Sequence, residues 1–245
     1  MTYNKKPKMI FFDVGGTLFD GGKSDFAAGF SELLNYADNP DITNGNTLAA
    51  LWDEYLNMVH GSKSESGLPL EIPLSAIIKY ACMHAGVKFS IPLSHQEEIF
   101  DRYNSTRKVI DGVVDLLEEL KNLGIRTAVI SNNAMSGESL ALSIQRWIPS
   151  AQFEFCLTSA DLLLCKPCKS IFTAAISYAG LSPSDCWYCG DGKIPDVMGA
   201  LNSGMVPVLY DSQAQKPFEI CVDEEKRQYL TINHWNELKN CLSNM

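Results

Sequence analysis

The sequence predicts an α/β protein whose core is a doubly wound, Rossmann-like parallel sheet, and three observations support this. The run Met9–Phe12 consists of four apolar residues, as is typical of a strand buried on both faces. From Asp111 onward, helical patterns alternate with short apolar runs, an order that demands right-handed crossovers and a parallel sheet. Polar residues follow several of these runs, and open α/β sheets bind ligands at the carboxyl ends of their strands.

The first apolar run ends at Asp13, which is followed by Val14, Gly15, Gly16 and Thr17. Two glycines allow a tight turn and let backbone N–H groups approach an anion closely. A carboxylate in this position can bind a metal or attack a phosphorus atom. An aspartate that only caps the turn is the alternative.

The region from 21 to 107 has a different pattern. Apolar residues recur at helical spacing in four segments, Ser24–Ala37, Thr47–His60, Pro73–Ala85 and Ser94–Tyr103. Turn-forming residues separate these segments. We therefore expect an all-helical insert over residues 21–107, and a core formed by residues 1–20 and 108–245.

From Asp111 onward, the chain alternates between helical patterns and short apolar runs. The helical patterns cover Asp111–Leu123, Ser136–Trp147, Ser170–Ala179 and Val197–Ser203. The apolar runs are Ile125–Ile130, Phe153–Leu157, Leu162–Leu164, Cys186–Cys189 and Val206–Tyr210, and the segments Tyr229–Ile232 and His234–Leu242 close the chain. Gly124 and Gly180 are suitable helix stops.

Four polar motifs follow apolar runs: Asp13 to Thr17, Ser131-Asn132-Asn133, Lys166-Pro167, and Gly190-Asp191 with Asp196. Together they resemble the haloacid dehalogenase superfamily. Its signature is an Asp-x-Asp-x-Thr strand end, a Ser or Thr after the second strand, a Lys often followed by Pro, and a Gly-Asp with a further acid. All four occur in this order, and the resemblance covers the whole chain. It implies a helical cap domain, inserted after the first strand, that closes over the active site.

The resemblance also implies a Mg²⁺-dependent hydrolase that forms an aspartyl phosphate on Asp13. The metal would be held by Asp13, the carbonyl of Gly15 and Asp191, with Asp196 in support. Three converging carboxylates cannot all ionise cheaply without a cation, and their oxygens suit Mg²⁺. Lys166 would neutralise charge on the nucleophile and on the transferring phosphoryl group.

Four further residues would hold phosphate oxygens: Gly16, Thr17, Ser131 and Asn132. Simpler interpretations remain open. Ser131 can be a strand-end cap, Lys166 a solvated loop lysine, and Asp191 with Asp196 an acid pair stabilised by a helix dipole.

Gly15 departs from the family pattern, because the phosphatases carry a second Asp there. That Asp is the general acid for the leaving group and then the base for water, and proton transfer contributes on the order of 10²–10⁴ in rate. Dehalogenases and phosphonatases also lack it, but dehalogenases do not use the metal. Because Asp191 and Asp196 are present, the sequence favours a phosphatase for a small phosphorylated metabolite. The alternatives are a carbon–halogen or carbon–phosphorus hydrolase, and a catalytically weak member that binds a ligand.

Composition excludes several other classes. The chain has 245 residues, of which 46% are hydrophobic and 20% charged, as in ordinary globular proteins. Its net charge of −9, without a Lys/Arg-rich block, argues against nucleic acid or an anionic membrane as partner. The N-terminal apolar run is interrupted too early, by Asp13, for a signal peptide or a spanning helix, so we expect a cytoplasmic protein. Its oligomeric state is not indicated.

The spacing Cys165-x-x-Cys168 and Cys186-x-x-Cys189 matches a four-thiolate zinc site. However, Cys186 and Cys189 lie in an apolar run, and residues three apart on a strand point to opposite faces. We therefore expect reduced, mostly buried thiols and no structural zinc.

Overall fold

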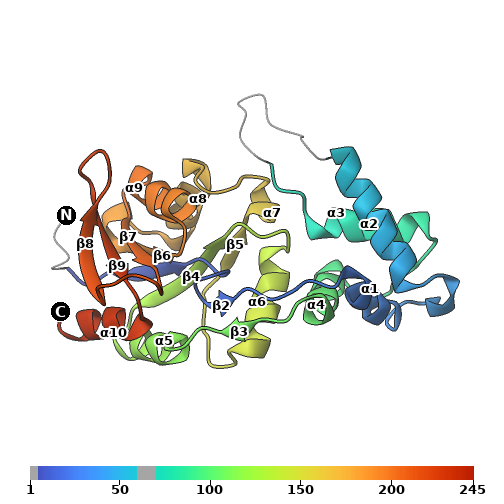
Figure 1. The fold of residues 1–245 in the computed structure, drawn as a ribbon, viewed down its shortest axis with the longest axis horizontal. Helices are drawn as coiled ribbons and strands as arrows, with labels where there is room; N and C mark the ends of the chain where they lie inside the picture. Colours follow the sequence, from blue (N-terminus) through green and yellow to red (C-terminus); the bar gives the residue numbers. More distant parts are fainter. Residues whose placement is uncertain (1–4, 60–69) are drawn as a thin grey trace.

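The computed structural model describes residues 5–59 and 70–245. A seven-stranded sheet runs through the larger end of the molecule in the order β5-β4-β1-β6-β7-β9-β8 (Figure 1). Its strands are β1 (Met9–Phe12), β4 (Arg126–Ser131), β5 (Cys156–Thr158), β6 (Cys186–Gly190), β7 (Val206–Tyr210), β8 (Phe218–Val222) and β9 (Gln228–Ile232). Only β8, at one edge, pairs antiparallel with its neighbour; the other pairings are parallel. The predicted α/β fold class is confirmed.

Side chains of β1 alternate between the two faces of the sheet, and all four are fully buried. Ile10 and Phe12 pack with α5, α6 and α10, whereas Met9 and Phe11 pack with α8 and α9. These helices are α5 (Val113–Asn122), α6 (Gly137–Trp147), α8 (Lys169–Ala179), α9 (Gly199–Asn202) and α10 (Trp235–Ser243). Burial on both faces explains why β1 is a continuous apolar run.

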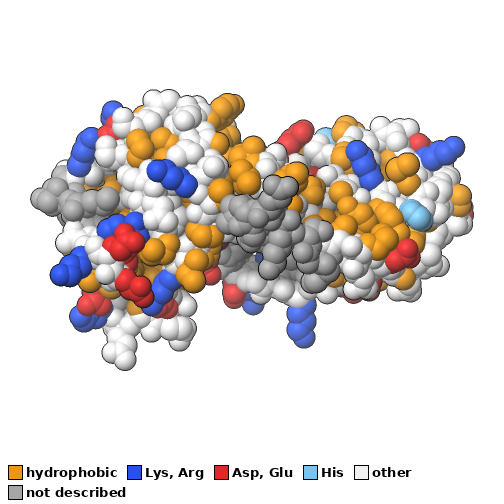
Figure 2. Space-filling model, turned by 90° about the horizontal axis from the view of Figure 1, so that it is seen from above, with side chains coloured by type: hydrophobic (Ala, Val, Ile, Leu, Met, Phe, Trp, Pro, Cys, Tyr) orange, Lys and Arg blue, Asp and Glu red, His pale blue; other side chains and the backbone are white. Residues whose placement is uncertain are grey.

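Four helices, α1 to α4, form a separate helical end beside the sheet (Figure 1). They are α1 (Phe26–Leu34), α2 (Gly45–Val59), α3 (Leu74–His84) and α4 (Leu93–Asn104). The Trp52 ring stacks on Phe26 and Phe100, with ring centroids 4.4 and 5.3 Å apart. Apolar side chains also gather on the outer surface of this end (Figure 2). Within the described ranges, no helix combines the length and apolarity needed to cross a membrane.

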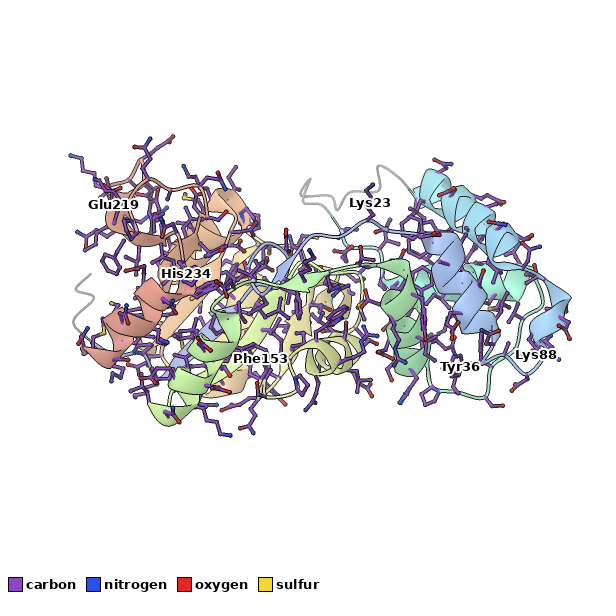
Figure 3. The ribbon with its side chains drawn as sticks, turned by 60° about the horizontal axis from the view of Figure 1, so that its bottom comes forward. Lys23, Tyr36, Lys88, Phe153, Glu219 and His234 are labelled. Carbon is purple, nitrogen blue, oxygen red and sulfur yellow. The ribbon has the colours of Figure 1, made fainter. Side chains whose placement is uncertain are left out.

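Two linkers connect the helical end to the sheet (Figure 3). The chain leaves through β2 (Phe19–Asp20) and returns through β3 (Lys108–Val109), and these short strands pair antiparallel. Further out, the Asp25 N–H donates to the Asn104 carbonyl at 2.6 Å, and the carboxylate of Asp25 caps α1 through the N–H of Ala28. The helical end is therefore joined to the sheet by a paired neck.

A second attachment joins α4 directly to α6. Glu97 is only 1% exposed, and its Oε2 accepts from the Ser136 N–H at 3.2 Å and the Ser136 hydroxyl at 2.6 Å. The Ser139 hydroxyl donates to the same oxygen. A carboxylate is favourable at this position because the N-terminus of α6 carries free N–H groups and the positive end of the helix dipole.

Three predicted elements differ in the structure. The run Leu162–Leu164 is not a strand: α7 (Ser159–Leu162) occupies its start, and Thr158 and Asp161 form a capping box there. The predicted strand Phe153–Leu157 is formed only from Cys156. The predicted helix Val197–Ser203 is divided between a π-helical turn, Lys193–Met198, and α9. The strands β2, β3 and β8 were not predicted.

Candidate active site

Three neighbouring strands bring polar residues to one edge of the sheet. Because β4, β1 and β6 lie side by side, Ser131, Asp13 and Asp191 converge at their carboxyl ends, and Lys166 reaches the same edge from the loop between α7 and α8. These four residues border a cavity of about 400 Å³, the site cavity. Its lining also includes Gly15, Asn132, Asp196 and, from the linkers, Gly22, Ser105 and Arg107.

Lys166 is the centre of the hydrogen-bond network in the site cavity. Its side chain is buried, and its Nζ donates to Asp13 Oδ1 at 2.8 Å, to Asp196 Oδ1 at 2.7 Å and to the Tyr188 hydroxyl at 2.7 Å. An ammonium has three N–H donors, so all of them are used. Lys166 is therefore not a solvated loop lysine; it fixes one oxygen each of Asp13 and Asp196.

Tyr188 is a residue of this network that the sequence reasoning missed. It lies in β6, fully buried, and its hydroxyl donates to the Ile130 carbonyl at 2.8 Å. Burial, with Asp196 and Asp13 nearby, raises its pKa well above the usual range, so the phenol keeps its proton. The available signal was a tyrosine in an otherwise apolar strand, three residues before Asp191, because a buried hydroxyl needs a partner.

Burial and charge oppose each other at Lys166. Burial lowers the pKa of this amine, but Asp13 and Asp196 stabilise the ammonium, and the net effect is a raised pKa. Burial also raises the pKa of Asp196, against the effect of Lys166, and it raises that of Asp191, where Asp13 and Asp196 add like charge. Three carboxylates thus face one buried ammonium, and the cluster favours protons or a cation.

Gly16 has a spatial role beside Asp191. Its φ is +67°, and a Cβ built on it would lie 2.2 Å from Asp191 Oδ2. A side chain there would expel the carboxylate, so glycine is needed both for the left-handed backbone and for the approach of Asp191. Gly190 is similar, because its Cβ would lie 2.4 Å from Asp196 Cγ.

The four residues expected to hold phosphate are not all brought together. Ser131 is 2% exposed and lines the site cavity. Asn132 also lines it, but its amide holds the Lys166 backbone, with Oδ1 accepting at 2.7 Å and Nδ2 donating at 3.2 Å. Gly16 and Thr17 are outside the lining. Thr17 is fully buried, and its hydroxyl has no hydrogen-bond partner among the described residues.

Cys186 and Cys189 point to opposite faces of the sheet, as expected for residues three apart on a strand. Cys186 packs with Tyr188 on one face of the sheet, whereas Cys189 packs with Trp187 on the other. Among the described residues, the one group of metal-ligating side chains found is Asp13, Asp191 and Asp196. The opposite orientation of the two thiols is confirmed, and the absence of zinc stays a prediction.

The aspartate cluster fits a divalent cation. One carboxylate oxygen from each of Asp13, Asp191 and Asp196 lies within 4.8 Å of the other two. Hard oxygen donors of this kind suit Mg²⁺. Burial first, and the like charges of Asp13 and Asp196 second, raise the pKa of Asp191, and a cation would relieve that repulsion.

The fold and the site together define a hydrolase of the haloacid dehalogenase type. The chain belongs to this family, because the model of the haloacid dehalogenase-like hydrolases matches residues 7–204. Among its relatives is the glyceraldehyde 3-phosphate phosphatase of Methanothermobacter thermautotrophicus, 24% identical over 96% of this chain and 99% of that protein.

Solved structures show the same fold. A 2-haloacid dehalogenase from Pseudomonas syringae pv. Tomato DC3000 has a TM-score of 0.61 at 19% identity, over 97% of this chain and 99% of that one. A phosphatase of the family from Thermococcus onnurineus has a TM-score of 0.53 at 16% identity, over 96% and 97% of the two chains. Both reactions therefore occur on this fold, and the residues of the site have to distinguish them.

Proposed function

We propose that this hydrolase is a Mg²⁺-dependent phosphatase that acts on a small phosphorylated molecule through an aspartyl phosphate on Asp13. The observation that carries the proposal is the pair of acids, Asp191 and Asp196, opposite Asp13 at the site cavity. Displacement of a halide from carbon by Asp13 does not require two further carboxylates, whereas phosphoryl transfer uses a divalent cation, which these carboxylates would hold and which would balance their charge. The phosphatase relative supports the same reaction.

In the first step, the carboxylate of Asp13 attacks phosphorus and the bond from phosphorus to the leaving oxygen breaks. Lys166 binds Asp13 Oδ1, so the other oxygen, Oδ2, is the one that attacks. Ser131 lies at the cavity wall, and its hydroxyl donates to a phosphate oxygen. Water then attacks phosphorus and the bond from phosphorus to Asp13 Oδ2 breaks, which restores the carboxylate and releases phosphate together with the proton of the water.

The residues that would hold Mg²⁺ are Asp13 and Asp191, with the carbonyl of Gly15 and with Asp196 in support. When bound, the ion supplies positive charge that offsets the carboxylates and the phosphoryl oxygens. Asp196 already accepts from Lys166 and, at 2.8 Å, from the Gly192 N–H, so its main role is to orient Lys166. The three carboxylates and Lys166 together leave two negative charges, and Asp191, which has no ion pair with Lys166, carries one of them.

Residues 21–107 act as a cap in this proposal. The linker residues Gly22 and Ser105 line the site cavity, so any movement of the helical end about its neck changes access to Asp13. Closure of such a segment excludes water and raises the strength of the electrostatic interactions inside.

Phosphate release from a metabolite panel, with and without Mg²⁺, tests the proposal. We expect release that depends on Mg²⁺, and none from Asp13→Asn, whose amide is nearly isosteric but cannot attack phosphorus. Circular dichroism should show that this variant is folded. Chloride release from 2-chloropropionate without a metal, in place of phosphate release, would identify a carbon–halogen hydrolase instead.

A further inference from the structure

Arg107, in the linker between α4 and β3, lines the site cavity together with Asp13 and Lys166. Its side chain is 14% exposed, and its guanidinium carbon lies 5.8 Å from the centroid of the Phe19 ring. Within the described part of the chain, only Nη2 has a hydrogen-bond partner, the carboxylate of Asp101. Because a guanidinium has five N–H donors, most of them are available to a ligand in the cavity.

The ion pair with Asp101 fixes the position of the Arg107 guanidinium. The Asp101 side chain is 8% exposed, and its second oxygen accepts from the Ser143 hydroxyl of α6 at 2.8 Å. Arg107 is therefore held between the helical end and the sheet helices. A guanidinium fixed in this way loses little side-chain entropy when it binds an anion.

Arg107 belongs to an ion-pair network that also contains Arg102 and Arg146. Arg102 and Arg146 both pair with Glu98, at 2.9 and 3.1 Å, and Arg107 pairs with Asp101. Of these three arginines, Arg107 is the one that lines the site cavity.

We propose that Arg107 binds a carboxylate on the leaving group, so that the preferred substrates are small phosphorylated carboxylic acids. This inference rests on the proposed phosphatase function. Among the described residues that line the site cavity, the other cation is Lys166, which uses all three of its donors on Asp13, Asp196 and Tyr188. Within this lining, Arg107 is the cation left for a second anion, and its planar fork matches a carboxylate.

The test compares two aryl phosphates of nearly equal size, 4-carboxyphenyl phosphate and 4-carbamoylphenyl phosphate, in the presence of Mg²⁺. The carboxylate carries a charge and the amide does not. We expect the intact protein to prefer the carboxylate by about tenfold or more in kcat/KM, as a charge-assisted hydrogen bond gives. Arg107→Met should remove this preference, and the ratio of the two values cancels any general loss of activity.

Two further variants keep the test decisive. Arg107→Met leaves Asp101 buried without its cation, so the double variant Asp101→Asn/Arg107→Met is measured too, and it should show the same loss of preference. Lys23→Met is the matched control, because Lys23 points outward from the other linker (Figure 3) and lies outside the lining of the site cavity; its ratio should equal that of the intact protein.

Either of two results would overturn the inference: no preference for the carboxylate in the intact protein, or a preference that persists in the double variant. Failure of the intact protein to release phosphate from both compounds would instead count against the proposed phosphatase function.

Discussion

Gly15 is exposed at the wall of the site cavity, and a Cβ built on it would meet nothing within 4 Å. It is also not one of the glycines with a positive φ, whereas its neighbour Gly16 is. Neither the backbone nor the packing therefore demands glycine at this position. The chain lacks a second acid here although the cavity has room for one, so the leaving group has to depart without a proton from this residue.

We predict that this absence makes the rate depend steeply on the pKa of the leaving group. Acyl and acidic aryl phosphates should be hydrolysed far faster than alkyl phosphates, because only an alkoxide needs protonation. Gly15→Asp should raise alkyl-phosphate hydrolysis by on the order of 10²-fold, measured as phosphate release from glycerol phosphate. Gly16→Asp is the control and should give no such increase, because its Cβ would lie 2.2 Å from Asp191 Oδ2. An intact protein that turns over alkyl phosphates at about 1–10³ per second would contradict this account.

A second prediction concerns Tyr188. Tyr188→Phe removes the acceptor of one Lys166 N–H and the donor to the Ile130 carbonyl. Loss of one hydrogen-bond partner of a buried charged group lowers the free energy of unfolding by about 1–3 kcal/mol. We expect urea unfolding of the variant to show a decrease of this size. We also expect phosphate release to slow, because Lys166 and hence Asp13 are held less firmly. Unchanged stability and rate would show that the hydroxyl has no part in orienting Lys166.

Asp185 gives a prediction for pH. Hydrogen bonds from Lys5 and Lys8 hold the pKa of its carboxyl below the usual range. Because the folded pKa is lower than the unfolded one, this carboxylate stabilises the fold above the unfolded pKa of about 3.9, and the contribution is lost as pH falls through the folded pKa. Asp185→Asn should therefore lower the urea midpoint at pH 7, and the difference should shrink toward pH 3. A difference that does not change with pH would contradict the assignment.

Among the elements, the strands with continuous apolar runs were predictable and those at the edges were not. β1 and β6 are buried on both faces, which leaves a clear signal in the sequence. β8 alternates between exposed and half-buried residues at the edge of the sheet, and β2 and β3 have only two residues each. The run Leu162–Leu164 was misleading, because Leu162 and Leu163 are exposed and a capping box at Thr158 starts a helix.

The same distinction applies to the site. Asp13 and Asp191 follow their strands and Ser131 is the last residue of β4. These strands are adjacent in the sheet, so the convergence of the three residues follows from the order of elements. Tyr188 and Arg107 reach the site through packing across elements, and no short motif contains that information. Thr17 was expected to hold phosphate because of its position in a motif, but its burial depends on α10, where the Trp235 N–H donates to the Thr17 carbonyl at 3.2 Å.

We predict that the attachment of α4 to α6 contributes measurably to stability. Glu97→Ala would remove the carboxylate that accepts from the Ser136 N–H and from the hydroxyls of Ser136 and Ser139, at a cost of about 1–3 kcal/mol in the free energy of unfolding. Glu118→Ala, an exposed position on α5, is the control and should change stability little. Equal effects of the two variants, measured by urea unfolding, would show that the attachment is energetically neutral.

At the scale of the molecule, the two ends share one apolar core. The cluster that contains Ile10 and Phe12 of β1 also contains Phe30, Leu33 and Trp52 of the helical end. Continuous burial of this kind favours cooperative unfolding, since neither end can lose its packing alone. A ligand that stabilises the site should therefore stabilise the whole chain.

Mg²⁺ should accordingly raise the thermal midpoint of the intact protein. A ligand at 100 times its Kd adds about 2.7 kcal/mol to stability, and the cation also relieves the repulsion within the aspartate cluster. The gain should be much smaller for Asp191→Asn, which removes one carboxylate of the cluster.

Metal analysis of the purified protein should find no tightly held zinc. A zinc ion lost on Cys186→Ser would contradict this prediction.

The paired neck determines where the helical insert of such a chain could be exchanged by recombination. Ser24 and Ser105 face each other across it, and a Cβ on Gly22 would lie 1.1 Å from the Thr106 carbonyl oxygen, so the two crossover points are adjacent. A foreign insert spliced at these points would leave β1 and Asp13 undisturbed. It would, however, leave Ser136 and its neighbours without the carboxylate of α4. Exchange of inserts between relatives should therefore succeed when α4 and the first turn of α6 are inherited together.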